Sequence, residues 1–183
     1  MIGIFSQPFL FFLYIDFLDV LLYNRCKVSE RDLLYYISER RAITMTPNEV
    51  FELISKHPVF HLATAEGDQP RVRGMLLFRA DENGIVFHTA STKDVYHQIM
   101  ANPKAEMCFS CGDTQIRITG VLELNEDPAL REEIFSHPSR KFLQAWKEHG
   151  IEGLLQVFVM KQCTAVTWTM ATNFEPKKPI VLC

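Results

Sequence analysis

From residue 46 onwards, short apolar segments alternate with residues that favour turns. The pattern predicts strands over residues 59–65, 71–79, 85–89, 105–110, 114–124, 155–160 and 164–170, with the last two joined as a hairpin around residues 161–163. Asn83-Gly84, between the second and third strands, is a typical hairpin turn. Because most strands follow one another without an intervening helix, we expect a mostly β fold, an antiparallel barrel or sandwich, and not a parallel α/β sheet.

Three segments of the same region carry helical signals. Thr46-Pro47-Asn48-Glu49 is a capping box with Pro at the first helical position, and His57-Pro58 ends the helix that it starts. A second helix is expected from Lys93 to about Ala101, directly after a strand. Asp127-Pro128 begins helical material that continues, with a break at residues 136–138, to about His149.

The chain upstream of residue 46 has a different character. Phe5 to Tyr23 is strongly apolar, but Asp16 and Asp19 interrupt it, which argues against a membrane-spanning helix of about 20 apolar residues. Residues 1–8 contain no Lys or Arg, and no small-residue cleavage site follows, so a secretory signal peptide is not indicated either.

Residues 25–41 predict an amphipathic helix, and Met45 directly precedes the capping box. We therefore expect residues 1–44 to be a hydrophobic, helical N-terminal extension and residues 45–183 to be the working domain. The extension is either an addition upstream of the true start or an arm that packs on a partner subunit. A membrane anchor is the lesser alternative.

The composition is that of an ordinary globular protein. The chain has 183 residues, 48% of them hydrophobic, and a net charge of −3, which does not favour electrostatic binding of nucleic acid. Five cysteines do not suggest a disulfide framework, and the Cys108/Cys111 pair lacks the second pair that a zinc site needs. We expect reduced, structural thiols and a cytoplasmic protein without a metal.

The segment Phe87 to Lys93 carries the strongest candidate chemistry. A strand there runs into a helix start that offers two hydroxyls, several backbone N–H groups and a lysine, which is the equipment for holding a phosphate. An ordinary Ser/Thr N-cap with a surface lysine is the alternative. His88 lies at the same joint, either as a proton donor or as a histidine packed in the barrel.

Polar side chains also share faces of two predicted strands. Arg71 and Arg73 flank Val72, so both guanidinium groups leave the same face, where an anionic ligand would relieve their repulsion; two solvated arginines are the alternative. Gln115, on the polar face of the 114–124 strand, is able to bond the edge of a heterocycle, although any amphipathic strand has such a face.

The order and spacing of five motifs resemble the pyridoxamine 5′-phosphate oxidase-like, FMN-binding split-barrel superfamily over about residues 46–175. The motifs are Leu62-Ala63-Thr64, Pro70-Arg71-Val72-Arg73, Phe87 to Lys93, Asn102-Pro103 and Gln115 to Gly120. Thr92 to Tyr96, with Gln98, looks most like the nitroimidazole-reductase-related branch. The resemblance implies a six-stranded antiparallel split β-barrel and a homodimer with FMN at the subunit interface.

The resemblance also implies roles for individual residues. Arg73 and Lys93 match residues that pair with the FMN phosphate, and Thr89, Ser91 and Thr92 match its hydroxyl and backbone donors. Gly74 and Met75 match the strand beneath the isoalloxazine, and Gln115 matches a ring-edge contact from either subunit.

The sequence departs from the oxidase at three places. Phe78 stands where the oxidase has a lysine, the Arg-Lys pair is Thr92-Lys93, and residues 164–183 lack the Arg-x-His substrate signature. We therefore expect an FMN-dependent oxidoreductase that passes hydride from a reduced nicotinamide to a small electrophile, a nitroaromatic or a quinone. The alternatives are a non-catalytic flavin- or haem-binding protein and a related oxidase on another substrate, with haem or a deazaflavin in place of FMN.

Overall fold

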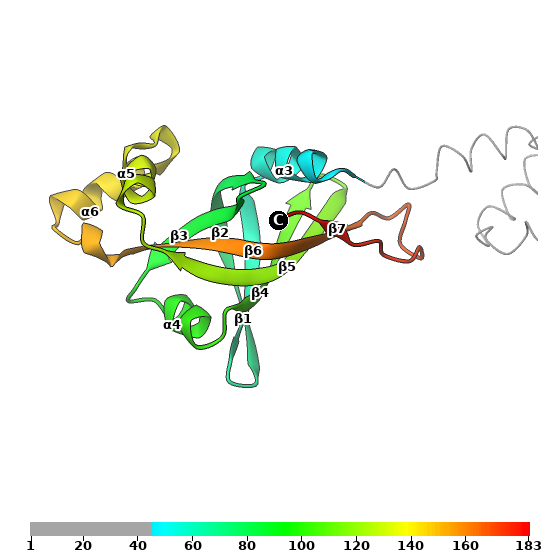
Figure 1. Cartoon of the computed structure of the whole chain (residues 1–183), viewed down its shortest axis with the longest axis horizontal. Helices are drawn as coiled ribbons and strands as arrows, with labels where there is room; N and C mark the ends of the chain where they lie inside the picture. Colours follow the sequence, from blue (N-terminus) through cyan, green and yellow to red (C-terminus); the bar gives the residue numbers. More distant parts are fainter. Residues whose placement is uncertain (1–44) are drawn as a thin grey trace, which may run out of the picture. The chain divides into compact units, whose positions relative to one another are not determined.

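The structure, a computed structural model, describes residues 45–183 (Figure 1). The strands are β1 (Val59–Glu66), β2 (Gln69–Asp81), β3 (Gly84–Ala90), β4 (Lys104–Cys111), β5 (Thr114–Asn125), β6 (Leu155–Trp168) and β7 (Ile180–Val181). The helices are α3 (Pro47–Lys56), α4 (Asp94–Ala101), α5 (Pro128–Ser136) and α6 (Gln144–Glu148), with 3-10 helices η2 (Pro138–Leu143) and η3 (Glu152–Leu154). The predictions for residues 1–44 lie outside the described residues.

The sheet closes on itself as a barrel. Its strand order is β3-β2-β1-β4-β5-β6-β7, every pairing is antiparallel, and an additional pairing joins β3 to β6. That pairing runs from Ile85 opposite Met160 to Ala90 opposite Leu155 and leaves β7 as a short appendage. The prediction of a six-stranded antiparallel barrel with helices is confirmed. None of the helices within residues 45–183 is long and apolar enough to cross a membrane.

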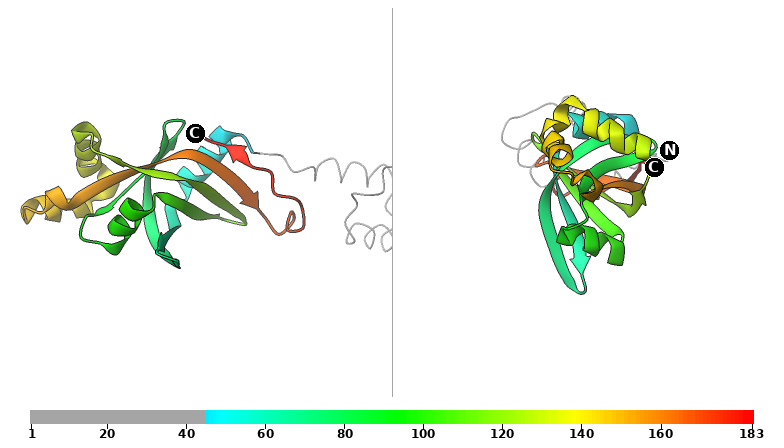
Figure 2. Two further views of the ribbon diagram at one scale, coloured as in Figure 1. Left: turned by 60° about the horizontal axis from the view of Figure 1, so that its bottom comes forward. Right: turned by 90° about the vertical axis from the view of Figure 1, so that its left-hand side faces the viewer.

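The predicted hairpin around residues 161–163 is wrong, because β6 is one continuous strand (Figure 2). Gln162 takes a left-handed φ of 51°, and the pairing of β6 with β5 shifts register between Thr119 and Val121. The polar residues therefore form a bulge that bends the strand without reversing it. Gly120 lies opposite, where a Cβ would come within 2.8 Å of the carbonyl oxygen of Lys161, so a side chain does not fit.

Aromatic side chains fill the barrel. Phe60 stacks on Phe109 with ring centroids 5.0 Å apart, and Phe87 stacks on Phe158 at 5.9 Å. All four are fully buried, and each contributes roughly 2–3 kcal/mol of hydrophobic stabilisation. Helix α3, begun by the predicted capping box, adds its buried face to this core.

A second apolar cluster lies between the barrel and the helices that follow β5. It consists of Val86, Leu130, Ile134, Phe135, Leu143, Leu155, Val157 and Val159. Residues from α5 and η2 thus cover one side of β3 and β6, while the other side of these strands faces the barrel core. Both faces of β3 are therefore buried, and its alternating side chains point either into the barrel core or toward α5 and η2.

The expectation that all cysteines are reduced is wrong for one pair. Cys163 on β6 and Cys183 are joined by a disulfide, with their Cα atoms 5.1 Å apart. The backbone N–H of Cys163 donates to the carbonyl of Cys183, and the N–H of Leu182 donates to the carbonyl of Cys163. These bonds and the β6–β7 pairing hold residues 180–183 against β6, a long-range contact that spacing alone does not reveal. Cys108 and Cys111 are free, and no cluster of metal ligands occurs among residues 45–183.

Candidate functional site

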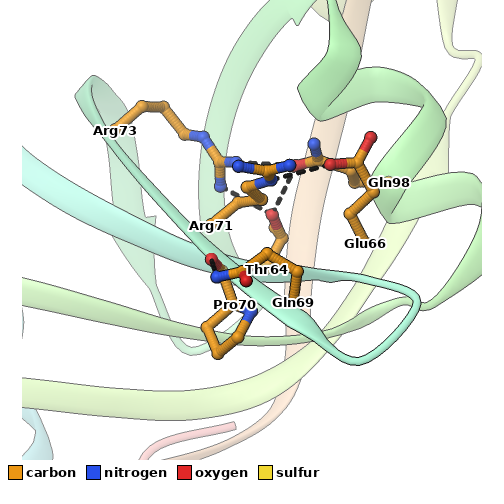
Figure 3. Close-up of polar contacts among 7 residues, drawn as sticks. All are labelled: Thr64, Glu66, Gln69, Pro70, Arg71, Arg73 and Gln98. Atoms are coloured by element: carbon orange, nitrogen blue, oxygen red, sulfur yellow. Dashed lines mark hydrogen bonds and ion pairs between the residues drawn. The ribbon is translucent and has the colours of Figure 1, made fainter.

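A cavity of about 450 Å³ lies between the β1–β2 hairpin and the first turns of α4. Polar and charged side chains dominate its wall. The lining residues are Glu66, Arg71, Val72, Arg73, Asp94, Val95 and Gln98. Both arginines predicted to share a face of β2 line this cavity. Figure 3 shows their guanidinium groups side by side, near Gln98.

Arg73 is held by a closed set of hydrogen bonds (Figure 3). One terminal nitrogen donates to the hydroxyl of Thr64 (2.6 Å) and to the backbone carbonyl of Leu62 (3.0 Å), and the other donates to Oε1 of Gln98 (2.6 Å). The Thr64 hydroxyl in turn donates to the same Gln98 oxygen at 2.7 Å. The guanidinium is thereby fixed between the middle of β1 and α4.

The two arginines differ in how their charge is balanced. Arg71 forms an ion pair with Glu66, with Nε and Oε2 2.7 Å apart. Arg73 has no carboxylate within ion-pair distance among residues 45–183, and all three of its acceptors are neutral. Burial lowers the pKa of Arg73, and the adjacent positive charge of Arg71 lowers it further. A partly buried cation without a counterion is well suited to an anionic ligand.

The start of α4, directly after the strand–helix joint, borders the cavity from the other side. Asp94 and Val95, the first residues of α4, line the cavity, whereas Ser91, Thr92 and Lys93 do not. The backbone N–H of Ser91 donates to the carbonyl of Leu154, and Lys93 is the N-cap without a side-chain cap bond. The exposed carboxylate of Asp94 lines the cavity but forms no ion pair with either arginine.

Thr89 and His88 lie on opposite faces of β3. Thr89 is buried, and its hydroxyl has no hydrogen-bond partner among residues 45–183. His88 instead faces η2, with its ring centroid 6.2 Å from that of Phe142, and its Nε2 is buried without a partner in the described chain. Burial lowers the pKa of His88 to about 4, with smaller contributions from the charges of Arg140 and Lys93. The structure therefore does not bring His88 together with Arg73.

The remaining predicted residues lie outside the cavity wall. Gly74 and Met75 follow Arg73 along β2, and a Cβ built on Gly74 meets no atom within 4 Å. Gln115 pairs with Ser110 and Trp168 on the far side of the barrel. Within this chain it is therefore not a neighbour of Arg73.

Sequence reasoning missed the cavity roles of Thr64, Glu66, Asp94 and Gln98. Two of these had a readable signal. Thr64 continues the buried positions Phe60 and Leu62 of β1, and Gln98 falls on the buried face of α4 beside Ile99. A polar side chain on an otherwise apolar face needs a hydrogen-bond partner, which here is Arg73.

A family model described as pyridoxamine 5′-phosphate oxidase matches residues 46–169, which is more than half of the chain. The chain belongs to the pyridoxamine 5′-phosphate oxidase family. The match begins at the capping box of α3 and ends just after β6, so the family region is the closed barrel with its helices.

A curated relative in this family is the pyridoxine/pyridoxamine 5′-phosphate oxidase of Rhizobium meliloti, 30% identical over 107 residues. The match covers 57% of this chain and 52% of the relative, and the chain spans only about half the length of the curated relatives it matches.

Several solved structures share the fold. A NimC/NimA family protein from Clostridium acetobutylicum is 23% identical with a TM-score of 0.57, covering 73% of this chain and 91% of that one. An FMN-binding protein from Nostoc punctiforme (18%, TM-score 0.53, covering 75% and 91%) is also similar. So is a haem-binding protein from Mycobacterium smegmatis (14%, TM-score 0.56, covering 76% and 60%).

Proposed function

We propose that this protein binds FMN and that the phosphate of FMN is held by Arg73. The observation that carries the proposal is the fixed guanidinium of Arg73, which faces a cavity of about 450 Å³ and has only neutral partners. The residues present fit FMN, since its phosphate supplies the negative counterion that Arg73 lacks. Membership of the family supports the same cofactor.

Other predicted residues complete the proposed site. The unpartnered hydroxyl of Thr89, the hydroxyls of Ser91 and Thr92 and the ammonium of Lys93 are the further groups that we assign to the phosphate. They lie beside the start of α4 and outside the cavity wall, and the backbone N–H of Ser91 is not among them because it already donates to the carbonyl of Leu154. The exposed Gly74 leaves room for a flat ring over this part of β2, because a Cβ there would meet no atom of the described residues within 4 Å apart from its chain neighbours. Met75, the next residue, is half-buried against the barrel core and would support the strand beneath the ring.

We propose that the protein works as a homodimer, because Gln115 is remote from Arg73 within one chain. A second subunit would bring its Gln115 to the ring edge. Val72, beside the cavity, is 66% exposed, and an apolar side chain in this position favours contact with a partner. The two free thiols of Cys108 and Cys111 support a cytoplasmic location, which we also propose, whereas the Cys163–Cys183 disulfide is more typical of an oxidising compartment.

The proposed activity is that of an oxidoreductase acting from a reduced nicotinamide onto a small nitroaromatic or quinone. FMN, when bound, supplies hydride and electron transfer. The chain's own residues anchor the phosphate and exclude water from one side of the ring. The lack of the Arg-x-His substrate signature in residues 164–183 argues against pyridoxamine phosphate as the substrate.

Haem is the second candidate, and one observation favours it. His61 is exposed on β1 and pairs directly with Gly74, so an imidazole is available at the same open surface. A flavin and a haem are distinguished by their absorption spectra, with bands near roughly 370 and 450 nm for an oxidised flavin and a Soret band for haem.

The test is an FMN titration of the purified protein and of Arg73→Met, followed by absorbance and flavin fluorescence. We expect the wild type to bind FMN and the variant to bind it at least about tenfold more weakly, because a charge-assisted contact is lost. Arg117→Met, at an exposed arginine on β5, is the matched control and should bind FMN normally. Equal affinities of all three proteins, or no binding by the wild type, would refute the proposal.

A further inference from the structure

Gln98 occupies an unusual place for an amide side chain. It lies on the face of α4 that packs on the barrel and is only 6% exposed, as is Thr64 on β1. Both polar groups are buried beside apolar neighbours, so each needs hydrogen bonds to offset the loss of water. Their shared partner is the guanidinium of Arg73.

The hydrogen-bond roles in this cluster are fixed by chemistry. Arg73 only donates, so the Thr64 hydroxyl accepts from it and uses its own proton toward Gln98. The Gln98 atom that receives both bonds must therefore be the carbonyl oxygen, Oε1. The NH₂ group of Gln98 then has no hydrogen-bond partner among residues 45–183, and Gln98 lines the cavity.

An amide and a carboxylate would orient Arg73 equally well but would leave different charges in the cavity. The neighbouring Arg71 is held by a carboxylate, since its Nε lies 2.7 Å from Oε2 of Glu66, which neutralises its charge. Gln98 is isosteric with Glu and holds Arg73 without neutralising it. The cavity thus keeps one oriented, uncompensated cation, and the free amide adds a neutral donor beside it.

We infer that Gln98 is a positioning and specificity-determining residue of this site. Its Oε1 fixes the guanidinium of Arg73 while leaving the charge available, and its NH₂ donates to an oxygen of the same bound oxyanion. The site therefore selects ligands that carry a phosphate group over otherwise identical ligands that lack one. This inference rests on the proposed FMN site and names what gives that site its preference.

Comparison of FMN with riboflavin, which lacks the phosphate, tests the inference. Wild type, Gln98→Glu and the control Gln162→Glu, which makes the same change at an exposed position on β6, are titrated with both flavins. We expect Gln98→Glu to weaken FMN binding by about tenfold or more and riboflavin binding by less than about twofold, because the new carboxylate competes only with the phosphate for Arg73. Gln162→Glu should leave both affinities unchanged.

Thr64 gives a second, uncharged test. Thr64→Val removes the hydroxyl that links Arg73 to Gln98 and should reduce the preference for FMN over riboflavin, whereas Thr64→Ser should restore it. Thermal melting of each variant establishes that it is folded. If FMN and riboflavin weaken equally in a folded Gln98→Glu protein, or neither changes, then Gln98 is only structural and the inference is wrong.

Failure of the cofactor proposal has a separate signature. If the wild type binds no FMN, the same variants are titrated with inorganic phosphate by calorimetry. Phosphate binding that is lost in Gln98→Glu and kept in Gln162→Glu would support the role of Gln98 on another phosphorylated ligand. Phosphate binding that is absent in the wild type, or unaffected by Gln98→Glu, would overturn it.

Discussion

His88 should make the stability of this protein fall as the pH is lowered from about 6.5 to about 4. Its pKa lies at about 4 in the folded state, against an ordinary value of 6.5, because burial between β3 and η2 disfavours the charged ring. In that window the unfolded chain binds a proton that the folded chain does not. Stability is therefore present in full above pH 6.5 and decreases until the pH reaches the folded pKa.

The size of the effect follows from the shift. One pKa unit corresponds to about 1.4 kcal/mol, so a fall from 6.5 to about 4 predicts a loss of about 3 kcal/mol from this one group. The charges of Arg140 and Lys93 act in the same direction as burial. His88→Phe removes the titrating ring and should flatten the pH dependence by about that amount while keeping the apolar contact with Phe142.

The assay is urea unfolding of the full-length protein at a series of pH values between 4 and 7.5, with fluorescence detection. His97→Phe, at an exposed histidine of α4, is the control and should keep the pH dependence of the wild type. The reasoning fails if His88→Phe loses stability on acidification as steeply as the wild type. It also fails if the imidazole of His88 titrates near pH 6.5 in a nuclear magnetic resonance experiment.

Three further outcomes are expected from the described residues. Glu66→Gln removes the carboxylate that pairs with Arg71, so that Arg71 becomes available to the phosphate of FMN. Because an exposed ion pair is weak, we expect FMN affinity to rise by a factor of only about three, and an unchanged affinity at low salt would argue against this prediction. Gly120→Ala should cost about 2 kcal/mol or more of unfolding free energy, since the added Cβ meets the backbone of β6, and a melting temperature equal to the wild type would contradict this. Reduction of the Cys163–Cys183 disulfide, which closes a segment of 20 residues, should lower stability by about 3 kcal/mol in chemical unfolding, with Cys183→Ser insensitive to reductant.

Local patterns in the sequence predict most strands and helices of the barrel. They fail at the positions where contacts between distant residues determine the structure. The alternation in residues 114–124 places Ile116 and Ile118 inside and Arg117 outside, as observed. The polar run Lys161-Gln162 has the composition of a turn, yet β6 continues through it because β5 pairs with both halves. No local property of residues 155–168 distinguishes the two outcomes.

The candidate site divides in the same way. The side chains of Arg71 and Arg73 share a face because a strand alternates with a period of two, and that much follows from sequence. The contact between Thr64 and Gln98 spans 34 positions and depends on how α4 packs on β1. His88 is adjacent in sequence to the predicted phosphate joint, but its side chain leaves the face of β3 that η2 covers, away from Arg73. The sequence alone does not reveal which face of β3 the helices cover.

The closure of the barrel by β6 has a consequence for the order in which the molecule assembles. Paired residues of β3 and β6, from Ala90 with Leu155 to Ile85 with Met160, are 65 to 75 positions apart, so this seam forms only after a large loop has been brought together. The hairpin and helix that hold Arg73 span residues 59–101, and the hydrogen bonds of Arg73 connect residues only 9 to 25 positions apart. On a ribosome, the residues that form the cavity emerge before the strand that closes the barrel, and their final rigidity depends on the arrival of residues 155–168.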